Sequence, residues 1–252
     1  MSSAKAQPVQ PAVPVLPAAS ARLGLRRSMI QLAFDLLGRL ALRPGPPLRP
    51  ADILILTAST PGIDSYASIA ADNKRRYAAR HGYAFQWRRD GFDPSRPPAW
   101  SKIRFIQQGL RTHRAVFWTD ADALIMDHAQ KLETFIDSRP IHLTRTLAPF
   151  PHLNTGHMFF RRSLFSRLFL VSTWRLVAFI HDSAWEQRAI NYLCETYRLP
   201  AVAIHPNRRF NSFGHVPADP DPYRPGDFVI HFPGLPDKTR LLQAYSALAP
   251  AP

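Results

Sequence analysis

The chain has 252 residues, 46% of them hydrophobic, so it is long enough to bury one large core. Lys and Arg number 32 against 18 Asp and Glu, and the net charge of +14 favours anionic partners: nucleic acid, an acidic membrane surface or a phosphorylated substrate. The single cysteine, Cys194, excludes an intrachain disulfide, and no apolar segment reaches the roughly 18 to 20 residues that span a bilayer.

The N-terminal 50 residues divide into three segments. Residues 1–21 are rich in Pro and Ala and lack the pattern of a secretory signal, so we expect a disordered or polyproline-like tail and a cytoplasmic location. Residues 22–43 predict a basic amphipathic helix. Residues 44–50 form a Pro-rich linker to a domain at 51–252.

The predicted helix at 22–43 has two interpretations. It would lie on the anionic inner face of a membrane, or it would pack against its own domain or a partner, and the sequence leaves both open. Its apolar face consists of Met29, Ile30, Ala33, Phe34, Leu37 and Leu40.

In the domain, periodicity predicts strands that alternate with helices. Strands are expected at 52–57, 83–87, 115–119, 141–144, 156–161, 201–205 and 227–232. Helices are expected at 69–81, 101–110, 128–136, 163–180, 183–197 and 235–248, and a proline-studded loop at 217–225. This alternation predicts an α/β fold with a parallel or mixed sheet covered by helices.

The apolar run at 115–119 stops at two aspartates, Asp120 and Asp122. We expect a buried strand that delivers both carboxylates to its C-terminal edge, where open α/β sheets bind ligands. Two carboxylates this close repel each other, and their burial is unfavourable without a cation. Mg²⁺ and Mn²⁺ prefer such oxygen ligands and often hold phosphates, so the pair predicts a metal–diphosphate site.

Two further candidates follow the expected strand at 227–232. His231 at its end is either a structural histidine or a nitrogen ligand that completes a Mn²⁺ site. Lys238 follows soon after, at an interval that allows it to reach a diphosphate.

Three polar residues are candidates for contacts to an organic substrate. Asn154 belongs either to an ordinary turn or to a site that binds sugar hydroxyls. Glu186 has capping-box spacing from Ser183, so it either seals a helix start or, together with Gln187, faces a pocket.

Six separated segments, in this order, resemble glycosyltransferase family 34, the α-galactosyl-, α-mannosyl- and xyloglucan xylosyltransferases. Together they cover roughly residues 52–240. They are Asn73-Lys74-x-x-Tyr77-Ala78-x-x-His81-Gly82-Tyr83, Trp100-Ser101-Lys102-Ile103, Trp118-Thr119-Asp120-Ala121-Asp122-Ala123, Asn154-Thr155-Gly156-x-x-Phe159-Phe160-x-Arg162, Trp185-Glu186-Gln187-x-Ala189-Ile190-Asn191-Tyr192-Leu193 and His231-Phe232-Pro233-Gly234.

The resemblance implies a GT-A fold, which is Rossmann-like with a single mixed, mostly parallel sheet flanked by helices. It also implies a UDP- or GDP-sugar donor, a glycan or glycolipid acceptor and retention of anomeric configuration. Two departures stand out. Family members often carry a transmembrane anchor, which this sequence does not show, and Lys238 lies further downstream than the family's lysine.

Residue by residue, the resemblance implies these roles. Asp120 and Asp122 would hold Mn²⁺ (or Mg²⁺) against the diphosphate, with His231 as third ligand. Lys238 would contact the phosphates, and Lys102 would neutralise the leaving diphosphate or position the donor. The sugar and acceptor side would be lined by Asn154, Glu186 and Gln187. Retention would proceed by attack on the same face or by double displacement through a carboxylate such as Glu186.

Two other classes of protein remain as alternatives. A haloacid-dehalogenase-like, Mg²⁺-dependent phosphatase also uses Asp-x-Asp after a strand, but it needs a second acidic pair, for which only Asp219 and Asp221 are at hand. A nucleic-acid-binding protein would explain the charge. The arginine pairs at 75–76, 88–89, 161–162 and 208–209 are, however, scattered and belong to no known motif.

Overall fold

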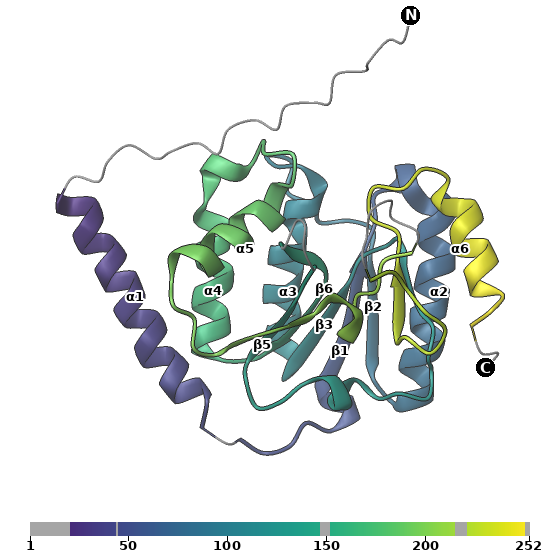
Figure 1. Ribbon diagram of the computed structural model, residues 1–252, viewed down its shortest axis with the longest axis horizontal. Coiled ribbons are helices and arrows are strands. Elements are labelled where there is room, and N and C mark those ends of the chain that lie inside the picture. The colour runs from purple at the N-terminus through teal and green to yellow at the C-terminus, as the bar shows by residue number, and fades with distance from the viewer. Residues whose placement is uncertain (1–20, 44, 147–151, 215–220, 250–252) are drawn as a thin grey trace, which may run out of the picture.

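The centre of the protein is a six-stranded mixed sheet of order β2-β1-β3-β6-β5-β7 (Figure 1). The computed structural model describes residues 21–43, 45–146, 152–214 and 221–249. The predicted tail at 1–21 lies almost entirely outside this range, as does part of the predicted loop at 217–225. The strands are β1 (Ile53–Ala58), β2 (Ala84–Arg88), β3 (Ala115–Thr119), β5 (Ile141–Arg145), β6 (Leu153–Arg161) and β7 (Val202–Pro206).

The strand directions confirm the predicted mixed, mostly parallel α/β sheet. β1 is parallel to β2 and β3, β5 is parallel to β7, and only β6 runs antiparallel to its neighbours β3 and β5. The helices are α1 (Ala21–Ala41), α2 (Asp64–His81), α3 (Ser101–Thr112), α4 (Leu164–Arg175), α5 (Trp185–Thr196) and α6 (Lys238–Ser246).

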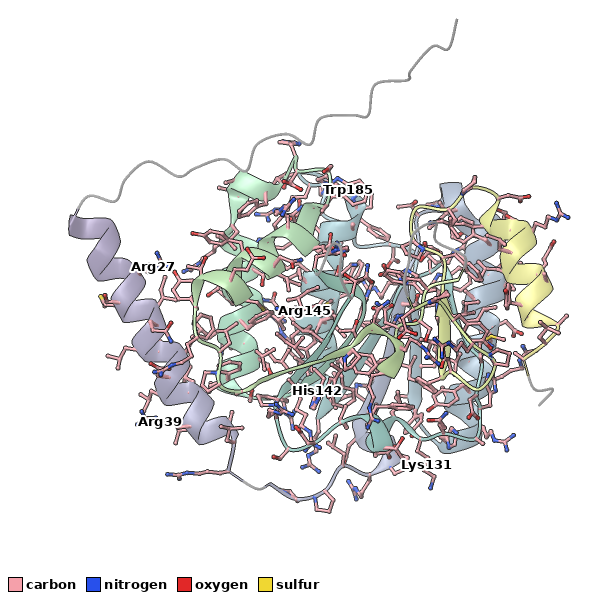
Figure 2. All side chains as sticks on the ribbon, in the orientation of Figure 1. Arg27, Arg39, Lys131, His142, Arg145 and Trp185 are labelled. Carbon is pink, nitrogen blue, oxygen red and sulfur yellow. The ribbon has the colours of Figure 1, made fainter. Side chains whose placement is uncertain are left out.

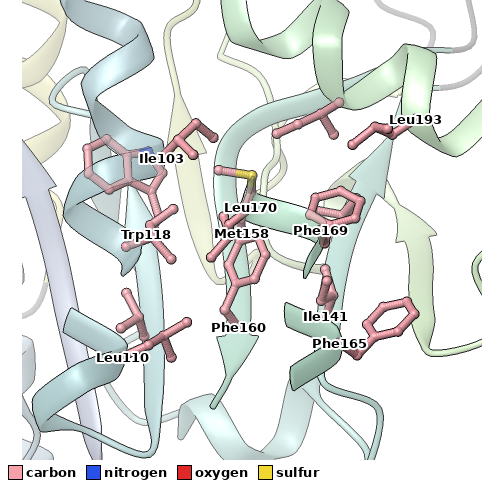
Figure 3. Close-up of a cluster of buried hydrophobic side chains, with 14 of the residues drawn as sticks. Ile103, Leu110, Trp118, Ile141, Met158, Phe160, Phe165, Phe169, Leu170 and Leu193 are labelled. Carbon is pink, nitrogen blue, oxygen red and sulfur yellow. The ribbon is translucent and has the colours of Figure 1, made fainter. Parts of the chain in front are cut away.

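Both faces of the sheet are covered, which explains why β1 and β3 are continuous apolar runs. On one face, Leu54, Val116 and Trp118 pack with side chains of α1, α3, α4 and α5 (Figure 3). On the other face, Ile55 and Phe117 pack with α2 and with the segment around residue 228. Consecutive side chains of a strand point to opposite faces, so each central strand contributes to both cores.

The predicted helix at 128–136 is wrong: only a short 3₁₀ turn, Leu132–Phe135, forms there. Hydrogen bonds to distant parts of the chain hold this segment and its start in a non-helical path. The N–H groups of Met126 and Asp127 donate to the carbonyl of Phe228, and the Tyr77 hydroxyl donates to the carbonyl of Gln130.

Several other boundaries differ from the predictions. The helix expected at 163–180 ends at Arg175, because Leu176 leaves helical geometry with φ −79° and ψ 65°. Helix α2 begins at Asp64 instead of 69, β6 begins at Leu153 instead of 156, and β8 (Val229–His231) is shorter than the expected strand at 227–232.

Helix α1 packs against the domain through one side. Phe34 is fully buried, and its ring centroid lies 5.6 Å from that of Phe165 on α4. Asp35 forms an ion pair of 3.1 Å with Arg198. Only part of the predicted apolar face is therefore buried, because Met29 and Leu40 are exposed to solvent. Among the described residues, no helix combines the length and apolar character needed to cross a membrane.

Candidate active site

A two-stranded ribbon brings His231 to the aspartate pair. Asp120 and Asp122 follow β3, and β4 (Ala123–Ile125), which the sequence did not predict, starts directly after them. β4 pairs antiparallel with β8 so that Ala123 lies opposite His231. As a result, ligand atoms of Asp120, Asp122 and His231 lie within 4.8 Å of one another, as predicted for the metal site.

Asn211, which the sequence did not indicate, sets the chemistry of His231. Its amide nitrogen lies 2.8 Å from Asn207 Oδ1 and 2.9 Å from Asn154 Oδ1, both acceptors, so its oxygen faces the rings of His157 and His231. This oxygen is 2.7 Å from His157 Nδ1 and 2.9 Å from His231 Nδ1. Both rings therefore donate from Nδ1.

Because Nδ1 donates to Asn211, Nε2 is the ring atom of His231 that remains to ligate a metal ion, as in a metal-ligating histidine with an outer hydrogen-bond partner. This Nε2 atom lies 3.2 Å from Asp122 Oδ1. Two acceptors at this distance repel unless a cation or a proton lies between them. The donor set of two carboxylates and one imidazole thus fits Mn²⁺ or Mg²⁺.

Gly156 makes room for the histidine. A Cβ atom at this position would lie 2.2 Å from His231 Cε1, a distance that real Cβ contacts do not reach. The Asn154-Thr155-Gly156 segment is therefore part of the site as well as the start of β6. Asn154 Nδ2 also donates to Gln187 Oε1 at 3.2 Å, which joins two of the predicted substrate-side residues.

Lys102 links the aspartate pair to α5. Its Nζ atom lies 3.1 Å from Asp120 Oδ1 and 2.8 Å from Glu186 Oε1, so one ammonium group bridges the two carboxylates. Burial acts to lower the pKa of Lys102, but the two carboxylates outweigh burial and hold it above the usual value. Lys102 therefore stays charged.

The capping-box interpretation of Glu186 is wrong. The N-cap of α5 is Ala184, and Glu186 Oε1 instead accepts a hydrogen bond from the Thr155 hydroxyl at 3.0 Å. The other oxygen, Oε2, is buried and has no hydrogen-bond partner among the described residues. A buried carboxylate oxygen without a partner is unfavourable, and a substrate hydroxyl would satisfy it.

Lys238 lies on the other side of the pair, at the first residue of α6, and donates to Asp122 Oδ2. Burial acts to raise the pKa of Asp122, but His231 and Lys238 hold it below its ordinary value. The lysine thus lies beside the aspartate pair despite its unusual spacing. It is the counter-ion of Asp122.

Lys74 is a third lysine at the site, and it was not among the predicted site residues. It is fully buried on α2, and its Nζ atom lies 2.6 Å from the carbonyl oxygen of Asp120. Burial lowers the pKa of Lys74 to about 7, against the opposing effect of Asp122 and Asp120. The sequence pointed to Lys74 only through the Asn73-Lys74 segment, which resembles the family.

A cavity of about 230 Å³ lies in front of Lys102, Asp120 and Asp122. Its aromatic wall includes Trp185, which sequence reasoning missed as a site residue. Trp185 is 45% exposed and has a left-handed backbone, φ 47°, which is rare for a large side chain and typical of functional positions (Figure 2). An exposed aromatic ring beside a cavity offers a stacking surface to a ligand.

The second acidic pair of a phosphatase is not supported. Asp221 forms a 3.2 Å ion pair with Arg208, and Asp219 lies outside the described residues. Within the described ranges, Asp120, Asp122 and His231 are the one cluster of three such potential ligands. The acidic pair is instead accompanied by a histidine and three lysines.

Part of the chain is similar in sequence to known glycosyltransferases. Residues 50–148 match the galactosyl transferase GMA12/MNN10 family, glycosyltransferase family 34. An uncharacterized alpha-1,2-galactosyltransferase of Schizosaccharomyces pombe is 27% identical over 223 residues, which cover 68% of this chain and 57% of that protein. The chain thus spans little more than half the length of this relative.

The fold is shared with solved glycosyltransferases. One is involved in glycosylation of the major capsid of PBCV-1 (20% identity, TM-score 0.60), and the match covers 76% of this chain and 98% of that one. Another is the galactosyltransferase LgtC with donor and acceptor sugar analogues (13% identity, TM-score 0.54), and it covers 79% and 97%. The match of residues 50–148 bears out the resemblance to glycosyltransferase family 34 over that part of the chain, and the fold is the GT-A fold of these solved glycosyltransferases.

Proposed function

We propose that the protein transfers a sugar, with retention of configuration, from a UDP- or GDP-sugar to a hydroxyl of a glycan or glycolipid. The observation that carries this proposal is the convergence of Asp120, Asp122 and His231 on one point, with Lys102 and Lys238 flanking it. Carboxylates plus imidazole suit a divalent cation, and the lysines suit the charge of a diphosphate. The names of the relatives point to sugar transfer as well.

Asp120, Asp122 and His231 would hold Mn²⁺ or Mg²⁺. When bound, the ion supplies Lewis-acid stabilisation of the negative charge on the departing diphosphate. Lys238 pairs with Asp122 in this structure, and its ammonium would contact phosphate oxygens once Asp122 serves as a metal ligand. Lys102 adds a fixed positive charge beneath the same point.

Glu186 and the Asn154–Gln187 pair would bind sugar hydroxyls. The Lys102 ammonium at 2.8 Å neutralises Glu186, which weakens this carboxylate as a nucleophile. We therefore favour same-face attack, in which the leaving phosphate accepts the proton of the acceptor, over double displacement through Glu186. Nuclear magnetic resonance of the first-formed product tests retention by its anomeric configuration.

The test is turnover of a panel of UDP- and GDP-sugars with and without Mn²⁺. We expect metal-dependent turnover in the wild type and a loss of about 1000-fold in Asp122→Ala, because the site loses a ligand and the charge that attracts the cation. Asp72→Ala is the matched control, since Asp72 is an exposed aspartate on α2. Circular dichroism checks folding.

The proposal fails if no donor in the panel shows metal-dependent turnover. It also fails if Asp122→Ala, folded, keeps the activity of Asp72→Ala.

A further inference from the structure

Helix α1 has a second apolar face that the domain does not cover. Met29, Leu32, Leu36 and Leu40 are 64%, 68%, 58% and 45% exposed. Their spacing of three, four and four residues places them in one stripe along the helix, away from the buried Phe34. A helix that is apolar on two sides is normally covered on both, and four exposed large side chains in one row indicate a binding surface.

The stripe is flanked by positive charge. Arg39 lies near the C-terminal end of α1 (Figure 2) and Arg43 follows the helix; both are exposed, whereas Arg27 donates to the carbonyl of Thr196 on the domain side. The single acidic residue of the helix, Asp35, is paired with Arg198. This combination of an apolar row and flanking arginines is typical of helices that lie in a membrane interface.

Two cavities continue the basic surface from α1 across α4 to α3. The larger, about 580 Å³, lies between α3 and α4 and is lined by Arg104, Arg111, Arg162 and Arg167. The second, about 340 Å³, shares Arg162 and Ser163 with it and reaches Leu40. The two cavities are therefore neighbours, and the second borders the apolar stripe.

These arginines are free to bind an anion. No carboxylate lines either cavity within the described residues. None of Arg104, Arg111, Arg162 and Arg167 pairs with a carboxylate in the part of the chain that the structure describes, although most other arginines near an acidic residue do. The guanidinium group is well suited to phosphate, which it binds through two parallel hydrogen bonds.

We propose that this α1/α4 face, formed by the stripe and the two cavities, docks on a bilayer that contains anionic phospholipids. The stripe would enter the acyl-chain boundary, and the arginines would bind headgroup phosphates. A second copy of the chain would place two basic faces against each other, which repel. Nucleic acid would leave the apolar stripe exposed. A bilayer matches both parts of the face.

The test is co-sedimentation of the full chain with vesicles of phosphatidylcholine alone or with roughly one third phosphatidylserine, at low and high salt and without any sugar donor. The proposal is thereby separated from the proposed sugar transfer, because a failed transferase assay leaves this result intact. The double variant Leu32→Glu/Leu36→Glu changes solvent-facing residues only. Its matched control is Val177→Glu/Leu248→Glu, which alters residues that are 62% and 73% exposed outside this face.

A second pair of variants tests the cavities. Arg111→Gln/Arg167→Gln removes two charges from the face, and Arg80→Gln/Arg240→Gln removes two exposed charges from α2 and α6, on the far side of the molecule (Figure 1). Each arginine near an anionic surface contributes about fivefold to partitioning, so we expect a loss of about 25-fold for the first pair and a much smaller loss for the second.

The expected result is salt-sensitive binding to anionic vesicles only, abolished in Leu32→Glu/Leu36→Glu and retained in both controls. Absence of binding by the wild type overturns the proposal. Equal losses in variants and controls overturn it too, since net charge alone would then explain binding. If the leucine variant binds as the wild type does, the contact is purely electrostatic and a polyanion such as nucleic acid replaces the bilayer as the partner.

Discussion

The candidate active site and the α1/α4 face both concentrate positive charge, but they do so with different side chains. The chain has only five lysines among its 32 basic residues, and three of them, Lys74, Lys102 and Lys238, contact Asp120 or Asp122. The α1/α4 face carries arginines alone. Buried, paired ammonium groups serve one region. Guanidinium groups serve the other, and most of them are exposed and without a carboxylate partner among the described residues, Arg114 with Asp52 being an exception.

The difference follows from the chemistry of the two cations. An ammonium is a compact point charge that fits between buried carboxylates and adjusts its pKa to them, whereas a guanidinium is planar, weakly hydrated and matched to phosphate at a surface. The lysines of the candidate active site should therefore contribute to the free energy of unfolding, and the arginines of the α1/α4 face should not. Four predictions test this comparison, in order of decreasing effect.

The largest effect is expected for Lys102→Met. The substitution leaves the buried Glu186 and the neighbouring Asp120 without their cation, and a broken buried ion pair destabilises by roughly 3–5 kcal/mol. Urea unfolding measures the free energy of unfolding. Lys131→Met, at an exposed lysine, is the control and should change it by less than about 0.5 kcal/mol. Similar values for the two variants would remove the distinction between buried and exposed lysines.

His142 tests what burial does to a basic group whose nearest carboxylate, that of Asp137, lies 3.6 Å away. Burial dominates and lowers the pKa of His142 to about 4. The unfolded chain then takes up a proton between about pH 6.5 and 4 while the folded chain does not. Stability is thus fully present above pH 6.5 and falls as the pH drops toward 4, by on the order of 3 kcal/mol for this group.

Urea unfolding of wild type and His142→Gln at pH values of about 7.5 and 5 measures this effect. The variant should lose less stability on acidification than the wild type. An identical loss in both would place the acid sensitivity in other buried histidines, such as His157, whose pKa burial also lowers.

Lys238→Met should tighten the binding of Mn²⁺ in the absence of donor, by about tenfold. The ammonium competes with a divalent cation for Asp122, so its removal takes away a competitor worth roughly 1.4 kcal/mol. Calorimetric titration of the metal into wild type, Lys238→Met and Lys131→Met provides the comparison. Weaker binding in Lys238→Met alone would mean that the lysine supports the ligands instead of competing with the ion.

The smallest effect is expected for Arg111→Gln/Arg167→Gln on stability. Both side chains are exposed and lack ion pairs with described carboxylates, so the free energy of unfolding should stay within about 0.5 kcal/mol of the wild type. Thermal and urea unfolding check this. A loss above about 2 kcal/mol would show that the face supports the fold, contrary to the proposed contrast.

Local patterns in the sequence predicted the sheet and one half of the site. The apolar run before Asp120 fixes a buried strand, and the carboxylates then lie at its edge because strand direction leaves no other place for them. Lys102 followed from a resemblance, since its ion pair with Glu186 joins residues 84 positions apart, which no local pattern encodes.

The remaining parts depend on pairing over long distances. His231 reaches Asp122 only through the β4–β8 register, and β4 is too short to give a periodic signal. Asn211 lies in an irregular segment, and its importance comes from five partners scattered along the chain. Helix α1 has apolar residues on two sides, and only the packing in the structure shows which side is buried.

Gly156 has a consequence for comparing sequences. It carries no reactive group, yet the imidazole of His231 occupies the space that any side chain at this position would need. A side chain at position 156 and the imidazole at position 231 therefore exclude each other. A protein that keeps this backbone and this histidine must keep glycine at 156. A sequence with a larger residue at 156 and a histidine at 231 would have either a displaced ligand or a different ribbon register, and this single position would mark it as a protein without the site.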